Sequence, residues 1–221
     1  MTMFNSKSRR DFLRDLSFTA AALATTKLRA QTPENKTNRK LGIALLGLGG
    51  YASGELGPAL RQTKNCYLAG VVTGHPEKGE KWAAEYNLNK KNIYKYDNFD
   101  QIADNRDIDI VYVVTPPAIH PEFVIRAAKA GKHVISEKPM ATSVADCDRM
   151  IAACKAAKVK LAIGYRLHFD PYHKELMRLA REQELGPFTK MTGDFGFTVR
   201  NRIWRIDKKL AGGGPMMDVG I

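Results

Sequence analysis

The sequence predicts an α/β fold: a doubly wound parallel sheet followed by the beginning of an α+β open-sheet domain. Short apolar segments alternate with longer amphipathic segments between residues 40 and 165, as is typical of βαβ units. A glycine-rich turn joins the first apolar segment to the amphipathic segment that follows. After residue 165 the alternation stops, and a charged helical segment precedes a stretch rich in Phe, Thr and Gly. We therefore expect one domain over residues 40–165 and the start of another over 166–221.

Each expected strand is a short apolar run that ends at a glycine, a proline or a polar turn. The clearest is Asp-Ile-Val-Tyr-Val-Val, which stops just before Pro116 and Pro117. The expected strands are residues 41–46, 67–73, 108–114, 133–136 and 159–163. Because parallel sheets are covered on both faces, such runs are apolar throughout rather than alternating.

The expected helices lie between these strands, and several of their ends carry start or stop signals. Pro121 suits the first turn of one helix, and Gly131 suits its end. Ser143 followed by Asp146 is typical of an N-cap. The other helices are expected at residues 51–63, 76–86, 143–157 and 171–184. On the helix over 143–157, the expected apolar face consists of Val144, Cys147, Ile151 and Cys154.

The first thirty residues predict an export signal. Ser8-Arg9-Arg10-Asp11-Phe12-Leu13 resembles the twin-arginine consensus, and a mildly apolar Ala/Thr-rich stretch leads to Ala30. Residues 1–30 hold six basic and two acidic side chains, so their removal lowers the formal net charge from +12 to +8. We therefore expect a periplasmic protein that is exported in the folded state, with residues 31–39 as a flexible arm.

Charge, hydropathy and cysteine spacing exclude several other classes of protein. Basic side chains alternate with acidic ones along the expected helices, which argues against a nucleic-acid partner. No apolar run approaches the roughly 18 residues of a spanning helix, so we expect no membrane association after signal removal. Cys147 and Cys154 lie about 10 Å apart if they share a helix, beyond disulfide reach. With Cys66 they make an odd number of cysteines, and we expect neither a disulfide nor a metal site.

A glycine motif follows the first expected strand. The segment Gly47-Leu48-Gly49-Gly50-Tyr51-Ala52 fits the pattern G-x-G-x-x-G/A directly before a helix. The first glycine permits a tight turn, the next lets backbone amides approach a pyrophosphate, and the small alanine allows close helix packing. The alternative is a turn that serves packing alone. At this position the motif predicts a dinucleotide-binding Rossmann domain, with Gly47, Gly49, Gly50, Tyr51 and Ala52 lining the cofactor.

The end of the second expected strand favours NADP over NAD. An acid there would accept a hydrogen bond from the ribose 2′-hydroxyl of NAD. The strand instead runs into Thr73-Gly74-His75, and the first acid is Glu77. We expect the Thr73 hydroxyl and the Lys78 ammonium to meet a 2′-phosphate, although Lys78 is also compatible with an ordinary surface lysine.

The segment Glu137-Lys138-Pro139 lies at the carboxyl end of an expected parallel strand, where open α/β sheets place their ligands. A lysine beside a nicotinamide can hold a substrate hydroxyl and stabilise negative charge on oxygen as hydride leaves carbon. Pro139 can fix the local backbone through a cis bond. These three residues predict a catalytic loop.

Together these motifs resemble the Gfo/Idh/MocA oxidoreductases across residues 41–221. The resemblance also includes Thr115-Pro116-Pro117-x-x-His120, Gly164-Tyr165-Arg166 and Ala211-Gly-Gly-Gly-x-x-x-Asp218-x-Gly220. Within the family, the sequence is most similar to the periplasmic glucose–fructose oxidoreductases. It implies a homo-oligomeric enzyme with a small-molecule sugar substrate. Such an enzyme oxidises an aldose at C1 to its lactone and passes the hydride, through tightly bound NADP(H), to another sugar.

The resemblance also implies roles for individual residues. Lys138 and Asp218 would be catalytic, and the cofactor would be bordered by Thr115, Pro116, His120, Glu137, Arg166, Trp204 and Arg205. The family's acid/base His or Tyr follows the pattern Asp-x-Gly-x, so it is expected immediately after Ile221. The chain is therefore expected to be the amino-terminal portion of a longer enzyme, and this portion alone is expected to be catalytically inactive.

Two alternatives keep the fold and change the function. Another exported member of the family, such as an NAD-dependent glycosidase or a sugar or dihydrodiol dehydrogenase, would catalyse a different reaction. A non-catalytic member would only bind a ligand. The cofactor released by heat distinguishes the NAD-dependent members from the NADP-dependent ones.

Overall fold

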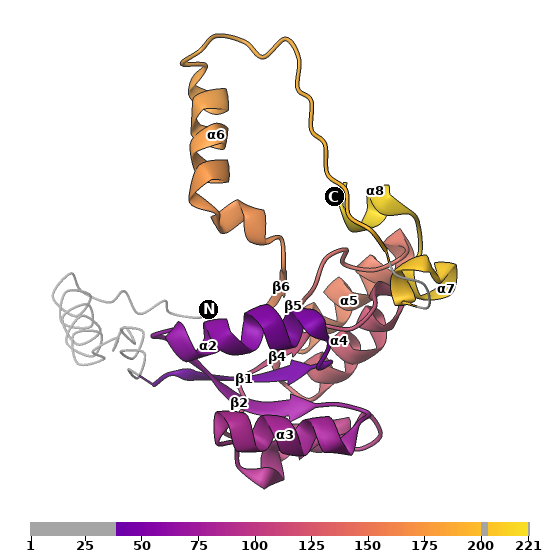
Figure 1. Cartoon of the computed structure of the whole chain (residues 1–221). Coiled ribbons are helices and arrows are strands. Elements are labelled where there is room, and N and C mark those ends of the chain that lie inside the picture. The colour runs from indigo at the N-terminus through magenta and orange to yellow at the C-terminus, as the bar shows by residue number, and fades with distance from the viewer. Residues whose placement is uncertain (1–38, 200–202, 221) are drawn as a thin grey trace, which may run out of the picture. The chain divides into compact units, whose positions relative to one another are not determined.

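A parallel six-stranded sheet organises the chain in the computed structural model, which describes residues 39–199 and 203–220 (Figure 1). Every neighbouring pair of strands is parallel. In sheet order the strands are β3 (Ile93–Tyr94), β2 (Cys66–Val72), β1 (Leu41–Leu46), β4 (Ile110–Val113), β5 (His133–Ser136) and β6 (Leu161–Ile163). The predicted α/β class is confirmed. The predicted export signal lies outside the described residues, as does the arm apart from Arg39.

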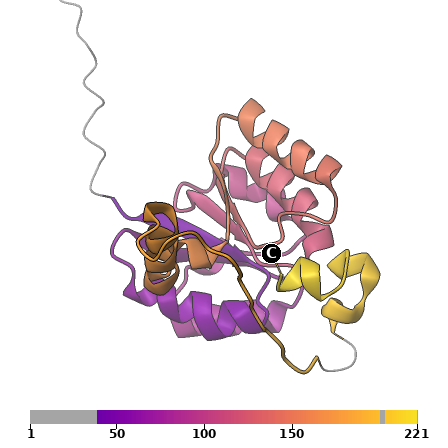
Figure 2. The same cartoon turned by 90° about the horizontal axis from the view of Figure 1, so that it is seen from above.

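Helices cover both faces of this sheet, as Figure 2 shows from above. On one face lie a π-helical turn (Ala52–Leu56), α2 (Gly57–Gln62) and α3 (Pro76–Tyr86). On the other lie α4 (His120–Lys129) and α5 (Val144–Ala156). Alternate residues of β1 pack into two separate apolar clusters, because successive strand side chains point to opposite faces. This two-sided burial explains why the strands are continuous apolar runs.

The sequence did not predict several short elements of the fold. β3 is only two residues long, too short to leave an apolar pattern. The other unpredicted elements are the 3-10 turns Lys90–Asn92, Phe99–Asp104, Pro117–Ile119, Arg166–Phe169 and Trp204–Ile206. All three cysteines are free, as predicted. None of the helices in the described part of the chain is long and apolar enough to cross a membrane.

The predicted apolar face of α5 is wrong in part. Met150 and Cys154 are buried at 0% and 3% exposure, whereas Val144 and Ile151 are 78% and 45% exposed. Because each residue turns an α-helix by about 100°, Val144 and Ile151 lie roughly 60° around the helix from Cys147 and Cys154. The buried stripe runs through Cys147, Met150 and Cys154. The N-cap prediction is confirmed, because the Ser143 hydroxyl accepts a hydrogen bond from the Asp146 backbone N–H at 3.1 Å.

The corrected face predicts the effect of trimming α5. Met150→Ala is expected to lower the free energy of unfolding by about 2–5 kcal/mol, because it leaves a cavity in a filled core. Val144→Ala is the matched control and is expected to change it by less than about 0.5 kcal/mol. Urea unfolding followed by circular dichroism measures both. Equal effects of the two substitutions would contradict this orientation of the helix.

Beyond β6 the described residues form helices and extended backbone, with no strand. They comprise α6 (Pro171–Glu182), an extended segment over 188–199, and the short helices α7 (Lys208–Ala211) and α8 (Pro215–Asp218). The Phe/Thr/Gly stretch expected to begin an open sheet is therefore extended but unpaired, and its large apolar side chains Phe188 and Phe195 are exposed. α7 contacts the 3-10 turn that precedes α4.

Candidate cofactor and catalytic site

The predicted site residues gather at the carboxyl edge of the sheet. The glycine turn follows β1, Thr115 follows β4, Glu137-Lys138-Pro139 follows β5 and Gly164-Tyr165-Arg166 follows β6. Because the strands are parallel, the segments that follow them leave the sheet at the same edge. Open α/β sheets bind their ligands at such an edge.

Open space lies beside part of the glycine turn. Gly47 has φ +99°, and a Cβ there would lie 2.7 Å from the Val114 carbonyl oxygen, so the protein's own packing demands glycine. A Cβ on Gly49 or Gly50 would meet no atom within 4 Å. Ala52 is fully buried under the helix that follows. The turn therefore fits a dinucleotide, because no protein atom fills the space beside Gly49 and Gly50, which leaves room for a phosphate.

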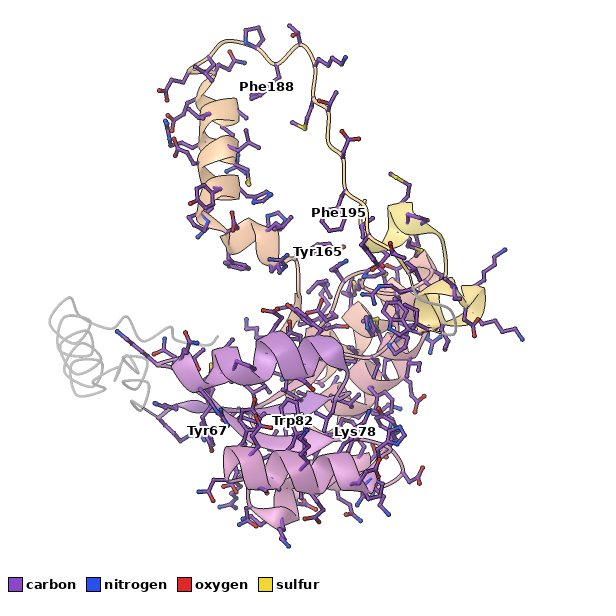
Figure 3. The ribbon with its side chains drawn as sticks, viewed as in Figure 1. Tyr67, Lys78, Trp82, Tyr165, Phe188 and Phe195 are labelled. Atoms are coloured by element: carbon purple, nitrogen blue, oxygen red, sulfur yellow. The ribbon has the colours of Figure 1, made fainter. Side chains whose placement is uncertain are left out.

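Lys78 faces the same turn across a cavity of about 290 Å³. Figure 3 shows Lys78 at the carboxyl end of the sheet, opposite the end where Tyr67 lies. The cavity is lined by Leu48, Gly49, Gly50, Ser53, Lys78, Lys81, Trp82, Glu85 and Tyr86. Lys81 was missed in the sequence, although its position three residues after Lys78 places both on one helix face. Two ammonium groups thus border the space beside the glycine turn.

Thr73 lies close by but is engaged internally. Its side chain is buried, and its hydroxyl accepts a hydrogen bond from the His75 backbone N–H at 3.1 Å. The hydroxyl thereby shapes the turn that leads into α3 and Lys78. The single proton of this hydroxyl takes no part in that hydrogen bond.

The Glu137 carboxylate is held at both oxygens. The Tyr112 hydroxyl donates to Oε1 at 2.5 Å, and the Lys138 backbone N–H donates to Oε2 at 3.2 Å. Burial, and then the nearby Glu137, raise the pKa of Tyr112 far above its usual range. The pKa of Tyr51 is also raised, by burial and then by Glu137, while Arg166 opposes the rise. The Glu137 carboxylate therefore lies close to both tyrosine hydroxyls.

Lys138 meets Asp218 at the edge of this group. The Lys138 ammonium donates to the Asp218 backbone carbonyl, and its Nζ lies 3.5 Å from the Asp218 Oδ1. The other carboxylate oxygen accepts from Arg205 Nε at 2.8 Å, and the Arg205 guanidinium stacks on the Trp204 ring. The peptide bond between Lys138 and Pro139 is cis, as predicted. Two residues eighty positions apart thus form one ion pair.

Residues 41–165 match the model of a protein family described as an oxidoreductase family with an NAD-binding Rossmann fold, GFO_IDH_MocA. The chain belongs to the Gfo/Idh/MocA oxidoreductases. The match covers more than half of the chain, including the glycine turn and the loop Glu137-Lys138-Pro139.

Individual relatives of this Gfo/Idh/MocA member differ in reaction. The crystal structure of an aldose-aldose oxidoreductase from Caulobacter crescentus, complexed with glycerol, is 48% identical with a TM-score of 0.79, over 81% of this chain and 54% of that one. D-xylose 1-dehydrogenase [NADP(+)] from Haloarcula marismortui is 28% identical over 85% of this chain and 53% of its own length. A 2,7-anhydro-N-acetylneuraminate hydratase from Escherichia coli is 34% identical over 62% of this chain and 35% of its own. The chain spans about half the length of the first two relatives.

His120 occupies an internal position in this Gfo/Idh/MocA chain. Its ring is fully buried, with Nε2 2.7 Å from the Thr115 carbonyl oxygen and Nδ1 3.1 Å from that of Pro139. Burial lowers the pKa of the ring, although the surrounding carbonyls pull it upward. His120 therefore joins the Thr115 loop to the catalytic loop, and it offers no free ring nitrogen to a nicotinamide. The motif that contains it gave no sign of this burial.

The other residues implied by the family stand as follows. Thr115 Oγ1 is buried and has no hydrogen-bond partner within the described ranges, which fits a ligand at this edge. Pro116 leads into the 3-10 turn before α4, and Arg166 is exposed at the start of its own turn. Trp204 and Arg205 lie beside Asp218. No cluster of His, Cys, Asp or Glu in the described chain could hold a metal ion.

Proposed function

We propose that this protein is an NADP-dependent sugar oxidoreductase that oxidises an aldose at C1 to its lactone and passes the hydride to another sugar. The observation that carries the proposal is the ion pair of Lys138 with Asp218, set at the sheet edge that holds the open glycine turn. The 48% identity to an aldose-aldose oxidoreductase supports the substrate class. The resemblance to the glucose–fructose oxidoreductases supports the paired reaction.

The chain's own residues would do the following. NADP, when bound, supplies the group that accepts a hydride from the sugar carbon and gives it up again. The Lys138 ammonium donates a hydrogen bond to the reacting sugar oxygen and stabilises the negative charge that develops there as the hydroxyl proton leaves to solvent. Asp218 holds that ammonium in place, and Arg205 in turn holds the Asp218 carboxylate. The Thr115 hydroxyl is free to bond the cofactor.

The choice of NADP rests on the lysines that face the glycine turn. Lys78→Ala is expected to raise the Kd for NADP+ about 10-fold and to leave the Kd for NAD+ unchanged, because only NADP+ carries the 2′-phosphate. Calorimetric titration of both cofactors measures the difference. Lys155→Ala, on the opposite face of the sheet, is the control and should change neither value. An equal loss of affinity for both cofactors would contradict the assignment.

The proposed reaction has a direct test. The complete protein is loaded with NADP+ and mixed with glucose, then with fructose, while nicotinamide fluorescence is followed. We expect fluorescence to rise with the aldose and to fall when the other sugar arrives. A loaded protein that glucose, xylose and galactose all fail to reduce would overturn the proposal.

We also propose that the protein acts in the periplasm. The twin-arginine pattern at Ser8–Leu13 supports this location. Cell fractionation compares the wild type with a variant in which Arg9 and Arg10 are both replaced by Lys. We expect the wild type in the periplasm and the variant in the cytoplasm.

A further inference from the structure

The Tyr112 hydroxyl lies against a carboxylate that belongs to the neighbouring strand. Tyr112 is part of β4, and Glu137 directly follows β5. The Glu137 backbone N–H donates to the Val113 carbonyl at 3.0 Å, which continues the pairing of these two strands by one step. The backbone thus fixes the start of the Glu137 side chain, and the 2.5 Å bond from Tyr112 fixes its far end.

Gly164 forms the third side of this enclosure. Its backbone N–H donates to the Ser136 carbonyl at 2.8 Å, which brings the end of β6 against the catalytic loop. A Cβ on Gly164 would lie 2.8 Å from Glu137 Oε1 and 3.2 Å from the Tyr112 hydroxyl oxygen. The Glu137 carboxylate therefore has no room to turn away from Tyr112 toward β6.

The constraint reaches the catalytic lysine through one atom. Glu137 Oε2 accepts the hydrogen bond of the Lys138 backbone N–H, so the orientation of the carboxylate sets the orientation of the next peptide. From the same residue, the Lys138 side chain extends to Asp218. A carboxylate released from Tyr112 would be free to rotate, and its hydrogen bond to the Lys138 backbone N–H would be lost.

We propose that Tyr112 is a positioning residue, which holds the Glu137 carboxylate and, through it, the Lys138 backbone in the orientation that the nicotinamide half of the cofactor requires. This inference rests on the proposed cofactor site at the sheet edge. The groups that face Glu137 are Tyr51 from the segment after the glycine turn, Tyr112 from β4, His120 from the start of α4 and Lys138 from its own loop. Among them, Tyr112 is the one whose hydroxyl donates to the carboxylate.

The test measures the binding of NADPH to the full chain by the quenching of tryptophan fluorescence, beside the binding of 2′,5′-ADP, which lacks the nicotinamide half. Tyr112→Phe keeps the ring and removes the hydroxyl. We expect its Kd for NADPH to rise at least about 5-fold. We expect its Kd for 2′,5′-ADP to stay unchanged, because this ligand does not reach the loop that holds Lys138. A merely structural role would weaken the binding of both ligands alike.

Three further variants keep the result decisive. Tyr67→Phe is the matched control, because its hydroxyl also makes one hydrogen bond, to the Asp107 carbonyl, at the other end of the sheet (Figure 3). It should bind both ligands as the wild type does. Gly164→Ala presses on the Glu137 carboxylate and on the Tyr112 hydroxyl, and it should weaken the binding of NADPH as Tyr112→Phe does. Glu137→Gln removes the charge of the side chain that Tyr112 holds, and it should also weaken the binding of NADPH more than that of 2′,5′-ADP.

The outcomes separate the two proposals. Binding by Tyr112→Phe that matches Tyr67→Phe in the Kd of both ligands would overturn the role of Tyr112. If Tyr112→Phe does not fold, wild-type binding of NADPH by Gly164→Ala overturns it equally. A wild-type chain that folds and binds neither NADPH nor 2′,5′-ADP would instead overturn the proposed function.

Discussion

Replacing Lys138 by Ala is expected to lower the rate at which an aldose reduces the bound cofactor by about 10²–10³-fold, while the cofactor stays bound. The ammonium is the only group in the described part of the site that we assign to the reacting sugar oxygen, and losing one such donor has an effect of this size. Rapid mixing of the NADP-loaded complete protein with glucose gives the rate. Fluorescence titration with NADPH gives the Kd, which should stay within about 3-fold of the wild type.

Two further variants show whether that loss of rate comes from the Lys138 ammonium itself. Asp218→Asn keeps the shape of the partner but removes its charge, so it should lower the same rate less than Lys138→Ala does. Lys155→Ala removes an ammonium from α5 and should leave the rate unchanged. Full activity of Lys138→Ala would show that the ion pair serves only the structure.

Replacing Gly47 by Ala is expected to remove both stability and cofactor binding. The residue has φ +99°, where a Cβ is strained, and that Cβ would lie 2.7 Å from the Val114 carbonyl oxygen. We expect the free energy of unfolding to fall by about 2 kcal/mol or more, because strain and backbone displacement add. Urea unfolding measures the first effect, and titration with NADP+ measures the second.

Gly49→Ala is the control that separates the two effects. No atom lies within 4 Å of the added Cβ, so the free energy of unfolding should change by less than about 0.5 kcal/mol. Binding of NADP+ should still be lost, because the methyl group occupies the space through which the pyrophosphate approaches the backbone. If Gly49→Ala binds NADP+ as the wild type does, that space is not the phosphate site.

The sequence predicted most of the sheet because buried parallel strands are short apolar runs with clear ends. The observed β1 and β5 have the predicted bounds, and β2 differs from its prediction by one residue at each end. The failures have physical causes. β3 is too short to leave a pattern, and the apolar pattern on α5 extends beyond the buried stripe, so it placed Ile151 on the core face, where the helix instead presents Met150.

The candidate site was predicted through its motifs, and what the motifs omit is the contact between them. Parallel strands bring the glycine turn and the catalytic loop to one edge, so their proximity follows from the topology alone. Whether His120 faces a ligand or the interior depends on the packing around it, which no local pattern encodes. The sequence predicts Tyr112 only as one residue of an apolar strand. Its hydroxyl gained a role only because β5 places a carboxylate beside it.

The bond between Lys138 and Asp218 sets an order of events during synthesis. The ribosome makes the whole of β1 to β6 before it reaches Asp218, and amino-terminal domains fold as they emerge. The glycine turn and Lys78 are thus in place while the lysine ammonium still lacks its acidic partner. The space beside the glycine turn, which we propose as the dinucleotide site, is therefore formed before the ion pair that we propose for hydride transfer.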